Sequence, residues 1–313
     1  MKKISIITPC FNEEDSIIEC IKQIKKIFDQ DLLNYELEHI FCDNGSSDNT
    51  VEILKQIAAK DRRIKIIVNS RNFGVLKNTY NGVLNATGDA AILFMPVDLQ
   101  DPPELIREFV KYWEKGYQIV YGMRTKRQEG FFYRNIRKVY YRLLSSCTYV
   151  EYPPDAGDYQ LVDRVVLNAM KQIDDAQPFM RLMTFDCGFR SFGIPYTWQA
   201  RKKGVSHNTL INMISQGLNG FVSFSSLPLR IALFFGSILS CLSITYAFCV
   251  GVMAALGKTS AVGRGVPTVI VALFFFSGIQ LLFAGILGEY ILAIYNQVRR
   301  RPLVIEKERV NFD

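Results

Sequence analysis

The 313-residue chain has a hydrophobic content of 49% and a formal net charge of +7. Only two histidines are present, which excludes a histidine-rich zinc site and argues against a Ser-His-Asp triad. The seven cysteines include no Cys-x-x-Cys pair, which predicts reduced, mostly buried thiols. The positive charge clusters beside two apolar segments near the C-terminus, which favours anionic lipid headgroups over nucleic acid as its partner.

The first 121 residues alternate between strand and helix patterns. The expected strands lie at 3–8, 35–42, 64–68, 90–95 and 118–121, and the expected helices at 13–28, 48–59, 75–86 and 103–115. Strands that alternate with helices predict a parallel sheet covered by helices on both faces. Ligands of such sheets bind at the carboxyl ends of the strands.

Polar side chains follow the first two expected strands. Asn12 and Glu13 come after the first strand, and Asp43 comes after the second. Amide and carboxylate groups match the donors of a base edge and the hydroxyls of a ribose, so these residues predict a nucleotide site. Helix capping is the alternative, because Asn12 and Asp48 both precede helices.

The third expected strand is followed by Arg71-Asn72-Phe73-Gly74. A glycine there allows the backbone to approach a phosphate closely, and an ordinary turn before a helix is the alternative.

The fourth expected strand is followed by Asp98-Leu99-Gln100. A carboxylate and a side-chain carbonyl two residues apart can share one hard cation, so the segment predicts Mg²⁺ or Mn²⁺ holding a diphosphate. The alternative is a helix start capped by Asp101, with Asp98 merely solvated.

Residues 130–206 show a less regular pattern, with an expected helix at 131–146 and an expected loop at 153–158. A basic run at 124–142 overlaps the start of this region. Arginine forks suit phosphate oxygens, so part of the run is expected to bind an anionic lipid headgroup; a solvated helix face is the alternative. The basic residues are Arg124, Lys126, Arg127, Arg134, Arg137, Lys138 and Arg142.

Asp155 and Asp158 on the expected loop could orient an acceptor or act as a base, or simply form a turn.

Two C-terminal stretches, 231–257 and 265–288, contain no charged residue, and each exceeds the ~20 residues needed to cross a bilayer. Apolar residues at helical spacing in 210–224 predict an interfacial segment before them. Lys202, Lys203 and Arg230 precede the stretches, Arg299, Arg300 and Arg301 follow them, and the connection carries only Lys258 and Arg264. No leader resembling a secretory signal opens the chain. The positive-inside rule therefore predicts two spans in the cytoplasmic membrane, with both termini in the cytoplasm.

Taken together, these motifs resemble the family 2 glycosyltransferases of GT-A fold, of the dolichyl-phosphate mannose synthase type. The resemblance extends especially to the bacterial bactoprenol glucosyltransferase branch with two C-terminal spans. The matching segments, in the expected order along nearly the whole chain, are 8–14, 43–48, 71–74, 98–104, 288–290 and 301–303.

The resemblance implies specific roles for residues of this chain. Contact with the nucleotide is implied for Pro9, Asn12, Glu13, Asp43 and Arg71. The implied metal ligands are Asp98 and Gln100. Contact with the acceptor phosphate is implied for Arg124, Arg134 and Arg181. The implied catalytic carboxylates are Asp98 and Asp158.

Three positions depart from the family pattern. Pro96 stands where the first acidic residue of Asp-Ala-Asp-Leu-Gln is usual, which shifts metal binding toward Gln100 and the diphosphate. Asn44 replaces the second aspartate of Asp-Asp-Gly-Ser. His207 lies where the family commonly has Ser-Lys-Tyr before the membrane helices.

The expected architecture is a mostly parallel, Rossmann-like GT-A sheet, followed by interfacial helices and two transmembrane helices. The expected divisions are a cytosolic catalytic domain at 1–205, an amphipathic segment at 206–229, a membrane hairpin at 230–296 and a cytosolic basic tail at 297–313.

The expected function is inverting transfer of one sugar, glucose as the best guess, from a nucleotide sugar, UDP-linked as the best guess, to undecaprenyl phosphate. The product would serve modification of a cell-envelope glycan such as lipopolysaccharide. Expected partners are the membrane, further copies of the chain, a flippase and a downstream glycosyltransferase. The alternatives are a polymerising glycan synthase and a catalytically inactive membrane scaffold, the latter suggested by Pro96.

Overall fold

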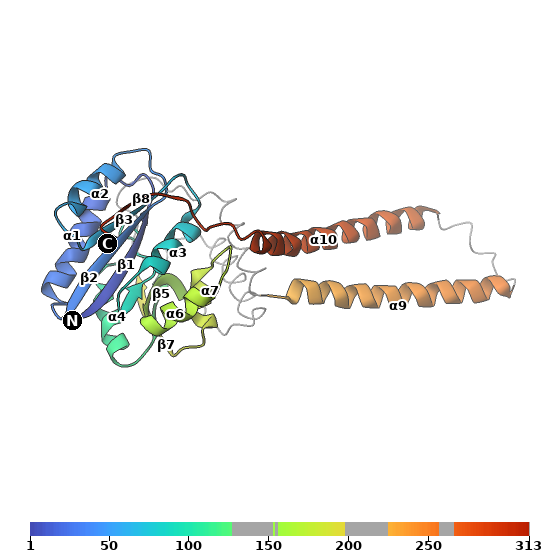
Figure 1. The fold of residues 1–313 in the computed structure, drawn as a ribbon. Coiled ribbons are helices and arrows are strands. Elements are labelled where there is room, and N and C mark those ends of the chain that lie inside the picture. Colours follow the sequence, from blue (N-terminus) through green and yellow to red (C-terminus); the bar gives the residue numbers. More distant parts are fainter. Residues whose placement is uncertain (127–152, 154–155, 198–224, 257–265, 313) are drawn as a thin grey trace.

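The computed structural model describes residues 1–126, 153, 156–197, 225–256 and 266–312. They form a layered α/β body from which two long helices project (Figure 1). The strands are β1 (Lys2–Cys10), β2 (Tyr35–Asp43), β3 (Ile64–Asn69), β4 (Ala90–Ile92), β5 (Ile119–Lys126), β6 (Ala156–Asp163), β7 (Ser191–Thr197) and β8 (Glu306–Val310). The helices are α1 (Ile17–Gln30), α2 (Thr50–Ala58), α3 (Val75–Asn85), α4 (Leu105–Glu114), α6 (Arg164–Gln172), α7 (Met180–Asp186), α9 (Leu227–Ala255) and α10 (Val266–Val298).

The strands form one sheet in the order β7-β5-β6-β4-β1-β2-β3-β8. Strand β1 pairs in parallel with β2 and β4, β2 with β3, and β5 with β7; β6 and β8 pair antiparallel with their neighbours. The predicted fold class, a mostly parallel α/β sheet with helices on both faces, is confirmed.

The core lies in two layers, one on each face of the sheet. Successive side chains of a strand point to opposite faces, so Ile4 and Ile6 of β1 join the cluster under α1, α2 and α4, while Ile7 joins the cluster under α3, α6 and α7. All three are fully buried. Central strands covered on both faces read as continuous apolar runs, which is why the pattern of β1 was recognisable in the sequence.

The expectation of a loop at 153–158 is wrong for its last residues, because β6 begins at Ala156 and contains Asp158. Strand β6 lies between β4 and β5, and its Leu161 and Val162 bury against opposite faces of the sheet. Pairing on both edges outweighs the local turn propensity of this Pro- and Gly-rich segment. The expected helix at 131–146 and most of the expected segment at 206–229 lie outside the described residues.

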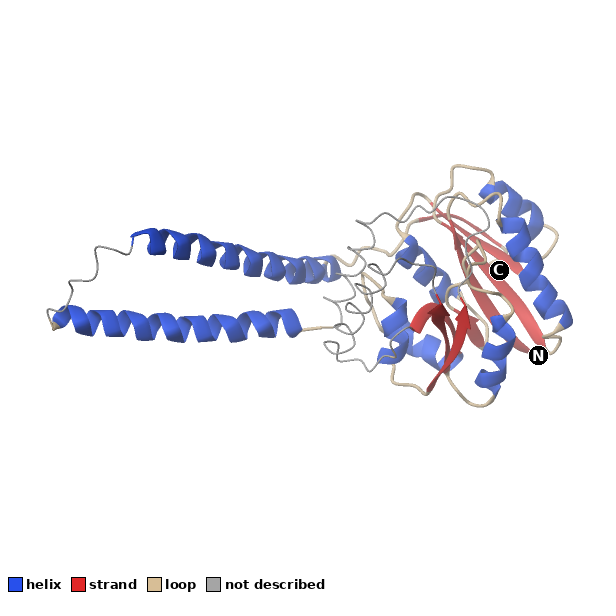
Figure 2. Cartoon of the chain, turned by 180° about the vertical axis from the view of Figure 1, so that it is seen from behind, coloured by secondary structure: helices blue, strands red, loops and turns tan. Residues whose placement is uncertain are grey.

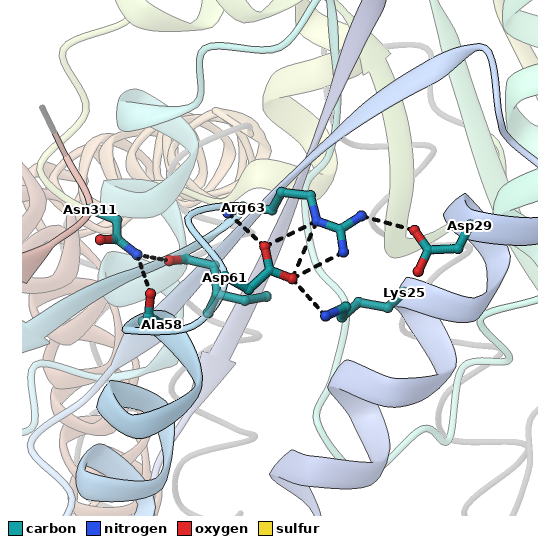
Figure 3. A network of polar contacts seen from close by, with 7 residues as sticks. Lys25, Asp29, Ala58, Asp61, Arg63 and Asn311 are labelled. Atoms are coloured by element: carbon teal, nitrogen blue, oxygen red, sulfur yellow. Dashed lines mark hydrogen bonds and ion pairs between the residues drawn. The ribbon is translucent and has the colours of Figure 1, made fainter.

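The segment expected to be a tail after the apolar helices contributes strand β8, which pairs antiparallel with β3. Asn311 donates from Nδ2 to the carbonyl oxygens of Ala58 at 3.0 Å and Ile64 at 2.8 Å (Figure 3). Next to these bonds, the Asp61 carboxylate forms ion pairs with Arg63 at 3.0 Å and with Lys25 at 2.6 Å. The two projecting helices are therefore an insertion between β7 and β8 of one sheet.

Helices α9 and α10 extend from the body in the same direction (Figure 2). They contain 29 and 33 residues, so they measure about 44 and 50 Å at 1.5 Å per residue. Within the described chain, the apolar segments Leu227–Tyr246 and Ala272–Val298 are long and apolar enough to cross a membrane, and they are not buried against the body. Both helices are longer than the roughly 30 Å hydrocarbon core of a bilayer.

A buried histidine in β2 makes the fold sensitive to acid. The ring of His39 is fully buried, with its Nε2 atom 2.8 Å from Thr8 Oγ1, and burial lowers its pKa from 6.5 to about 3. The unfolded chain therefore binds a proton that the folded chain excludes, and stability falls as the pH drops below about 6.5. We expect the free energy of unfolding to decrease by about 2 kcal/mol between pH 7 and pH 5, at 1.36 kcal/mol per pH unit below 6.5.

This expectation can be measured by denaturant titration followed by tryptophan fluorescence. The variant His39→Gln keeps a polar partner for Thr8 and carries no titrating ring, so its stability should depend less on pH over this range. Equal pH dependence in the two proteins would contradict the assignment of the effect to His39.

Candidate active site

Three polar loops meet at one edge of the sheet because β4, β1 and β2 are neighbours. Cys10, at the end of β1, is the register partner of Asp43, at the end of β2. The loop that contains Asp98 follows β4 on the other side of β1. The structure thus brings together the strand ends from which the sequence predicted a nucleotide and metal site, as expected for parallel strands.

Asn12 ties the first loop to the second. Its backbone N–H donates to Ser46 Oγ at 2.9 Å, and its Oδ1 accepts from the Ser47 N–H at 2.8 Å. Its φ of 54° is left-handed, a conformation that asparagine tolerates better than most residues. Asn12 is not a helix cap, because α1 begins after Ser16. Its role in the structure is to join two loops of the candidate site.

The other predicted contacts of the first loop lie beside Asn12. Pro9 is half-buried within β1, where its register partner is Cys42. The Glu13 N–H donates to Oγ1 of Thr50, the first residue of α2, at 2.9 Å, which connects the first loop to the start of that helix. Pro9 and Glu13 therefore lie at the same edge of the sheet as Asn12 and Asp43.

Asp43 is fully buried and organises the second loop. Its Oδ2 accepts from the backbone N–H groups of Gly45 and Ser46, both at 3.0 Å, and its Oδ1 accepts from Ser46 Oγ at 2.5 Å. Burial raises the pKa of Asp43 above its ordinary value, while these hydrogen bonds oppose the shift. The carboxylate therefore shapes the loop in addition to any contact with a ligand.

Asn44, at a position where the family usually has aspartate, connects this loop to the next one. Its Nδ2 donates to Asn72 Oδ1 at 2.9 Å, and its Oδ1 accepts from the Phe73 N–H at 3.0 Å. An ionised aspartate has no donor for the first of these bonds. Arg71 in the connected loop stacks on Phe73, with 3.9 Å between the guanidinium carbon and the ring centre, and is exposed.

Gly45 allows these two loops to touch. Its φ is +77°, and a Cβ placed on it would lie 2.8 Å from the carbonyl carbon of Arg71. We expect Gly45→Ala to destabilise the protein by about 1–3 kcal/mol, because the loop bearing Arg71 must move. For the same reason we expect weaker binding of UDP at the nucleotide site predicted from the sequence. Denaturant titration and UDP titration measure the two effects.

Gly116→Ala is the matched control for this substitution. Gly116 has a similar φ of +88°, but a Cβ there meets nothing within 4 Å. The control carries the backbone strain without the clash and should leave UDP binding unchanged. Equal effects of the two substitutions on UDP binding would contradict the loop contact.

The metal-binding prediction concerns the loop after β4. Asp98 Oδ1 accepts from the Gln100 N–H at 3.2 Å, and Leu99 between them has a left-handed φ of 55°. That conformation costs a residue other than glycine roughly 1–2 kcal/mol, so the surrounding structure enforces this loop shape. The alternative that Asp101 caps the following helix is wrong, because α4 begins after Glu104. Asp101 is buried and lies three positions before that residue.

The donor set of this loop fits a hard divalent cation. A carboxylate oxygen and a side-chain amide oxygen are the ligands that Mg²⁺ and Mn²⁺ prefer. Within the described residues, no group of three or more His, Cys, Asp or Glu side chains gathers as a closed metal cage. A cation at Asp98 and Gln100 would therefore take its remaining ligands from water and a bound diphosphate.

Arg124 is placed differently from an exposed phosphate-binding arginine. Its Nη2 lies 2.8 Å from Oδ2 of the buried Asp101, and its Nε donates to the Tyr196 hydroxyl at 2.9 Å. The Tyr196 hydroxyl also donates to Asp101. Sequence reasoning missed Tyr196, because no motif marks it and only the pairing of β7 with β5 brings it to Arg124.

Asp158 and Arg181, two other predicted site residues, form an ion pair. The Arg181 guanidinium donates to both carboxylate oxygens of Asp158, at 3.1 and 2.5 Å. Asp158 also acts electrostatically on Arg124, so opposite charges alternate from Asp101 to Arg181. Arg134, the third predicted arginine, lies outside the described residues.

A family model for glycosyl transferase family 2 matches residues 5–170, more than half of the chain. The chain belongs to glycosyl transferase family 2. The matched segment includes the strand-end loops and Asp158, whereas Arg181 and Tyr196 lie beyond it. The resemblance inferred from the motifs is confirmed, and the protein is a glycosyltransferase.

Relatives of this family 2 protein match it over nearly its whole length. It is 39% identical over 302 residues to the uncharacterized glycosyltransferase YkcC of Bacillus subtilis, covering 96% of this chain and 92% of that one. It is 32% identical to the SfII prophage-derived bactoprenol glucosyl transferase of Shigella flexneri, covering 98% of both chains. Among solved structures, the mannosyltransferase PcManGT from Pyrobaculum calidifontis, in complex with GDP-Man and Mn²⁺, is 14% identical, with a TM-score of 0.46 over 96% of this chain and 88% of that one.

Proposed function

We propose that this glycosyltransferase transfers one glucose from UDP-glucose to undecaprenyl phosphate, with inversion at the anomeric carbon. The observation that carries the proposal is the 32% identity, over 98% of both chains, to a protein named as a bactoprenol glucosyl transferase. That similarity includes the apolar C-terminal helices as well as the sheet. A soluble sugar acceptor would not account for such helices.

The donor would bind at the strand-end loops. Pro9 and Asp43 lie at the carboxyl ends of β1 and β2, and Asn12, Glu13 and Arg71 lie on the loops that follow β1 and β3. These loops are connected by hydrogen bonds, and the five residues would contact the nucleoside. Asp98 and Gln100 would hold Mg²⁺ or Mn²⁺, which supplies positive charge to the diphosphate of the donor. The enforced turn at Leu99 supports this role, because it sets the backbone geometry from which both side chains extend.

The acceptor would bind beside the alternating charges of Asp101, Arg124, Asp158 and Arg181. An oxygen of the lipid phosphate attacks the anomeric carbon, the bond from that carbon to the UDP oxygen breaks, and UDP leaves with the bonding electrons. A phosphate monoester is already anionic near neutral pH, so no strong general base is needed. Asp158 would orient Arg181 toward the acceptor phosphate, and rate enhancement would come mainly from positioning and charge stabilisation.

We propose that α9 and α10 cross the cytoplasmic membrane, with the catalytic domain and both termini in the cytoplasm. The pairing of β8 with β3 supports this topology, because the chain leaves and re-enters the same sheet around the two helices. Two spans return the chain to the side of the membrane from which it left, as the pairing of β8 with β3 requires. A single span would leave β8 on the opposite side from the sheet. The spans would hold the catalytic domain at the surface where the acceptor phosphate lies.

Within this proposal, the lipid-linked glucose would supply a later step of cell-envelope glycan modification, such as that of lipopolysaccharide. A flippase and a downstream glycosyltransferase would use the product, and the protein would act as a homo-oligomer. The division into a catalytic domain, an amphipathic segment, a hairpin and a C-terminal segment also remains a prediction.

The test is transfer of radiolabel from a panel of UDP- and GDP-sugars to undecaprenyl phosphate by the purified protein in detergent, with Mg²⁺, Mn²⁺ or EDTA. We expect metal-dependent label from UDP-glucose in the organic phase, with one sugar per lipid. A ladder of products would favour a polymerising synthase. Nucleotide binding without transfer from any donor would favour an inactive scaffold.

A further inference from the structure

A pocket lies between the α/β body and the residues around the C-terminal end of α10. Figure 1 shows that this end of α10 is the one nearest the body. It has a volume of about 340 Å³. Its walls come from α3, from the end of α6 and the segment after it, and from the end of α10 and the residues that follow. Gln297 of α10 connects the helix to the segment after α6 by two hydrogen bonds. Its Oε1 accepts from the Ala176 N–H at 2.9 Å, and its Nε2 donates to the carbonyl oxygen of Asp174.

The pocket is lined by cations from two different parts of the chain. Lys171 comes from α6, and Arg300 and Arg301 follow α10. Burial, and to a smaller extent the nearby Arg164, lowers the pKa of Lys171. Asp174 and Asp175 also line the pocket, so the titratable groups of its lining sum to one positive charge.

The pocket lies at the level of lipid headgroups if α10 spans the membrane. The apolar segment of α10 runs to Val298, and the pocket-lining Arg300 and Arg301 follow directly. Arginine forks and lysine ammonium groups are the usual partners of phosphate oxygens in proteins. The carbonyl end of a helix disfavours an anion, so several cations are required to bind one there.

We propose that this pocket binds a phosphate group, and that the phosphate is carried by the headgroup of a membrane phospholipid. Lys171, Arg300 and Arg301 contact the phosphate, and the bound lipid holds the body against the end of α10. The site is separate from the site of sugar transfer, since none of the residues assigned to donor, metal or acceptor lines it.

Native mass spectrometry of the full chain, titrated with phosphatidylglycerol in detergent, tests the proposal without any sugar-transfer reaction. We expect one phosphatidylglycerol bound per chain at low lipid concentration. A basic residue near an anionic surface contributes on the order of 1 kcal/mol, so Arg300→Gln and Lys171→Gln should each weaken binding by about fivefold.

Arg299→Gln is the matched control, because Arg299 stacks on Tyr295 and does not line the pocket. General attraction to a negative surface predicts an equal loss for Arg299→Gln and Arg300→Gln and no loss for Lys171→Gln, and that result would overturn the proposal. Unchanged thermal unfolding midpoints establish that the variants are folded.

A second arm of the experiment identifies the source of the phosphate. Glycerol 3-phosphate offers a phosphate group in soluble form, as a monoester rather than the diester of phosphatidylglycerol, and we expect it to bind far more weakly than phosphatidylglycerol. Binding of glycerol 3-phosphate without binding of phosphatidylglycerol, abolished by Lys171→Gln, would overturn the assignment to a lipid.

Discussion

Asp98→Asn is expected to reduce sugar transfer by about 10³-fold. The substitution keeps the size of the side chain and the turn at Leu99, but it removes the one carboxylate of the proposed cation site. Loss of a charge-stabilising group at a transition state typically costs 10²- to 10³-fold in kcat, and loss of the cation would add to this. The measurement is the initial rate of label transfer to undecaprenyl phosphate at saturating Mg²⁺.

Glu104→Gln is the control for Asp98→Asn. Glu104 is an exposed carboxylate on the same segment, six positions along the chain, and it precedes α4 without capping it through its side chain. The same change from carboxylate to amide there should leave the rate within about twofold of the wild type, as for most surface substitutions. Wild-type transfer by Asp98→Asn would contradict the assignment of Asp98 to the metal.

Arg124→Met is expected to destabilise the protein by about 3–5 kcal/mol and to abolish most sugar transfer. Asp101 has only 1% of its side-chain surface exposed, and its ion pair with Arg124 is part of a buried cluster with Tyr196. Removing one partner of a buried pair leaves an uncompensated charge, which is the costly case. Denaturant titration and the transfer assay give the two quantities.

The double variant Arg124→Met with Asp101→Asn separates structure from function. Removing both charges should recover most of the lost stability, because no isolated ion then remains buried. If Arg124 also contacts the acceptor phosphate, transfer by the double variant stays low. Recovery of both stability and transfer would show that Arg124 acts through the fold alone, against the role proposed for it at the acceptor.

The strand-end motifs show what a local sequence pattern can predict about the candidate site and what it cannot. Asn12, Asp43 and Asp98 were predicted at one edge of a parallel sheet, because the carboxyl ends of parallel strands meet there, and β4-β1-β2 are indeed neighbours. The pattern did not reveal that Asn12 joins two loops or that Asn44 supplies a donor to Asn72. Those contacts depend on how close the loops come, which Gly45 permits.

Asp101, Arg124 and Tyr196 illustrate the opposite case. From the sequence, a helix cap at Asp101 is only the alternative to a metal site at Asp98, and Arg124 is part of a basic run with an implied contact to the acceptor phosphate. Both interpretations rest on neighbouring positions in the chain. The partners are separated by 23, 72 and 95 positions. Interactions over such separations leave no periodicity in the sequence.

The sequence by itself determined the α/β class, the polar residues at the strand ends, the family motifs and two apolar segments long enough to span a membrane. These are properties of short stretches, set by side-chain period, turn chemistry and hydrophobic length. Only the tertiary structure decided that β6 continues past Asp158 between two strands and that β8 returns to the sheet beside β3. It alone also placed Lys171 and Arg300 on the walls of one pocket, because strand order and packing between distant segments arise from burial across the whole fold.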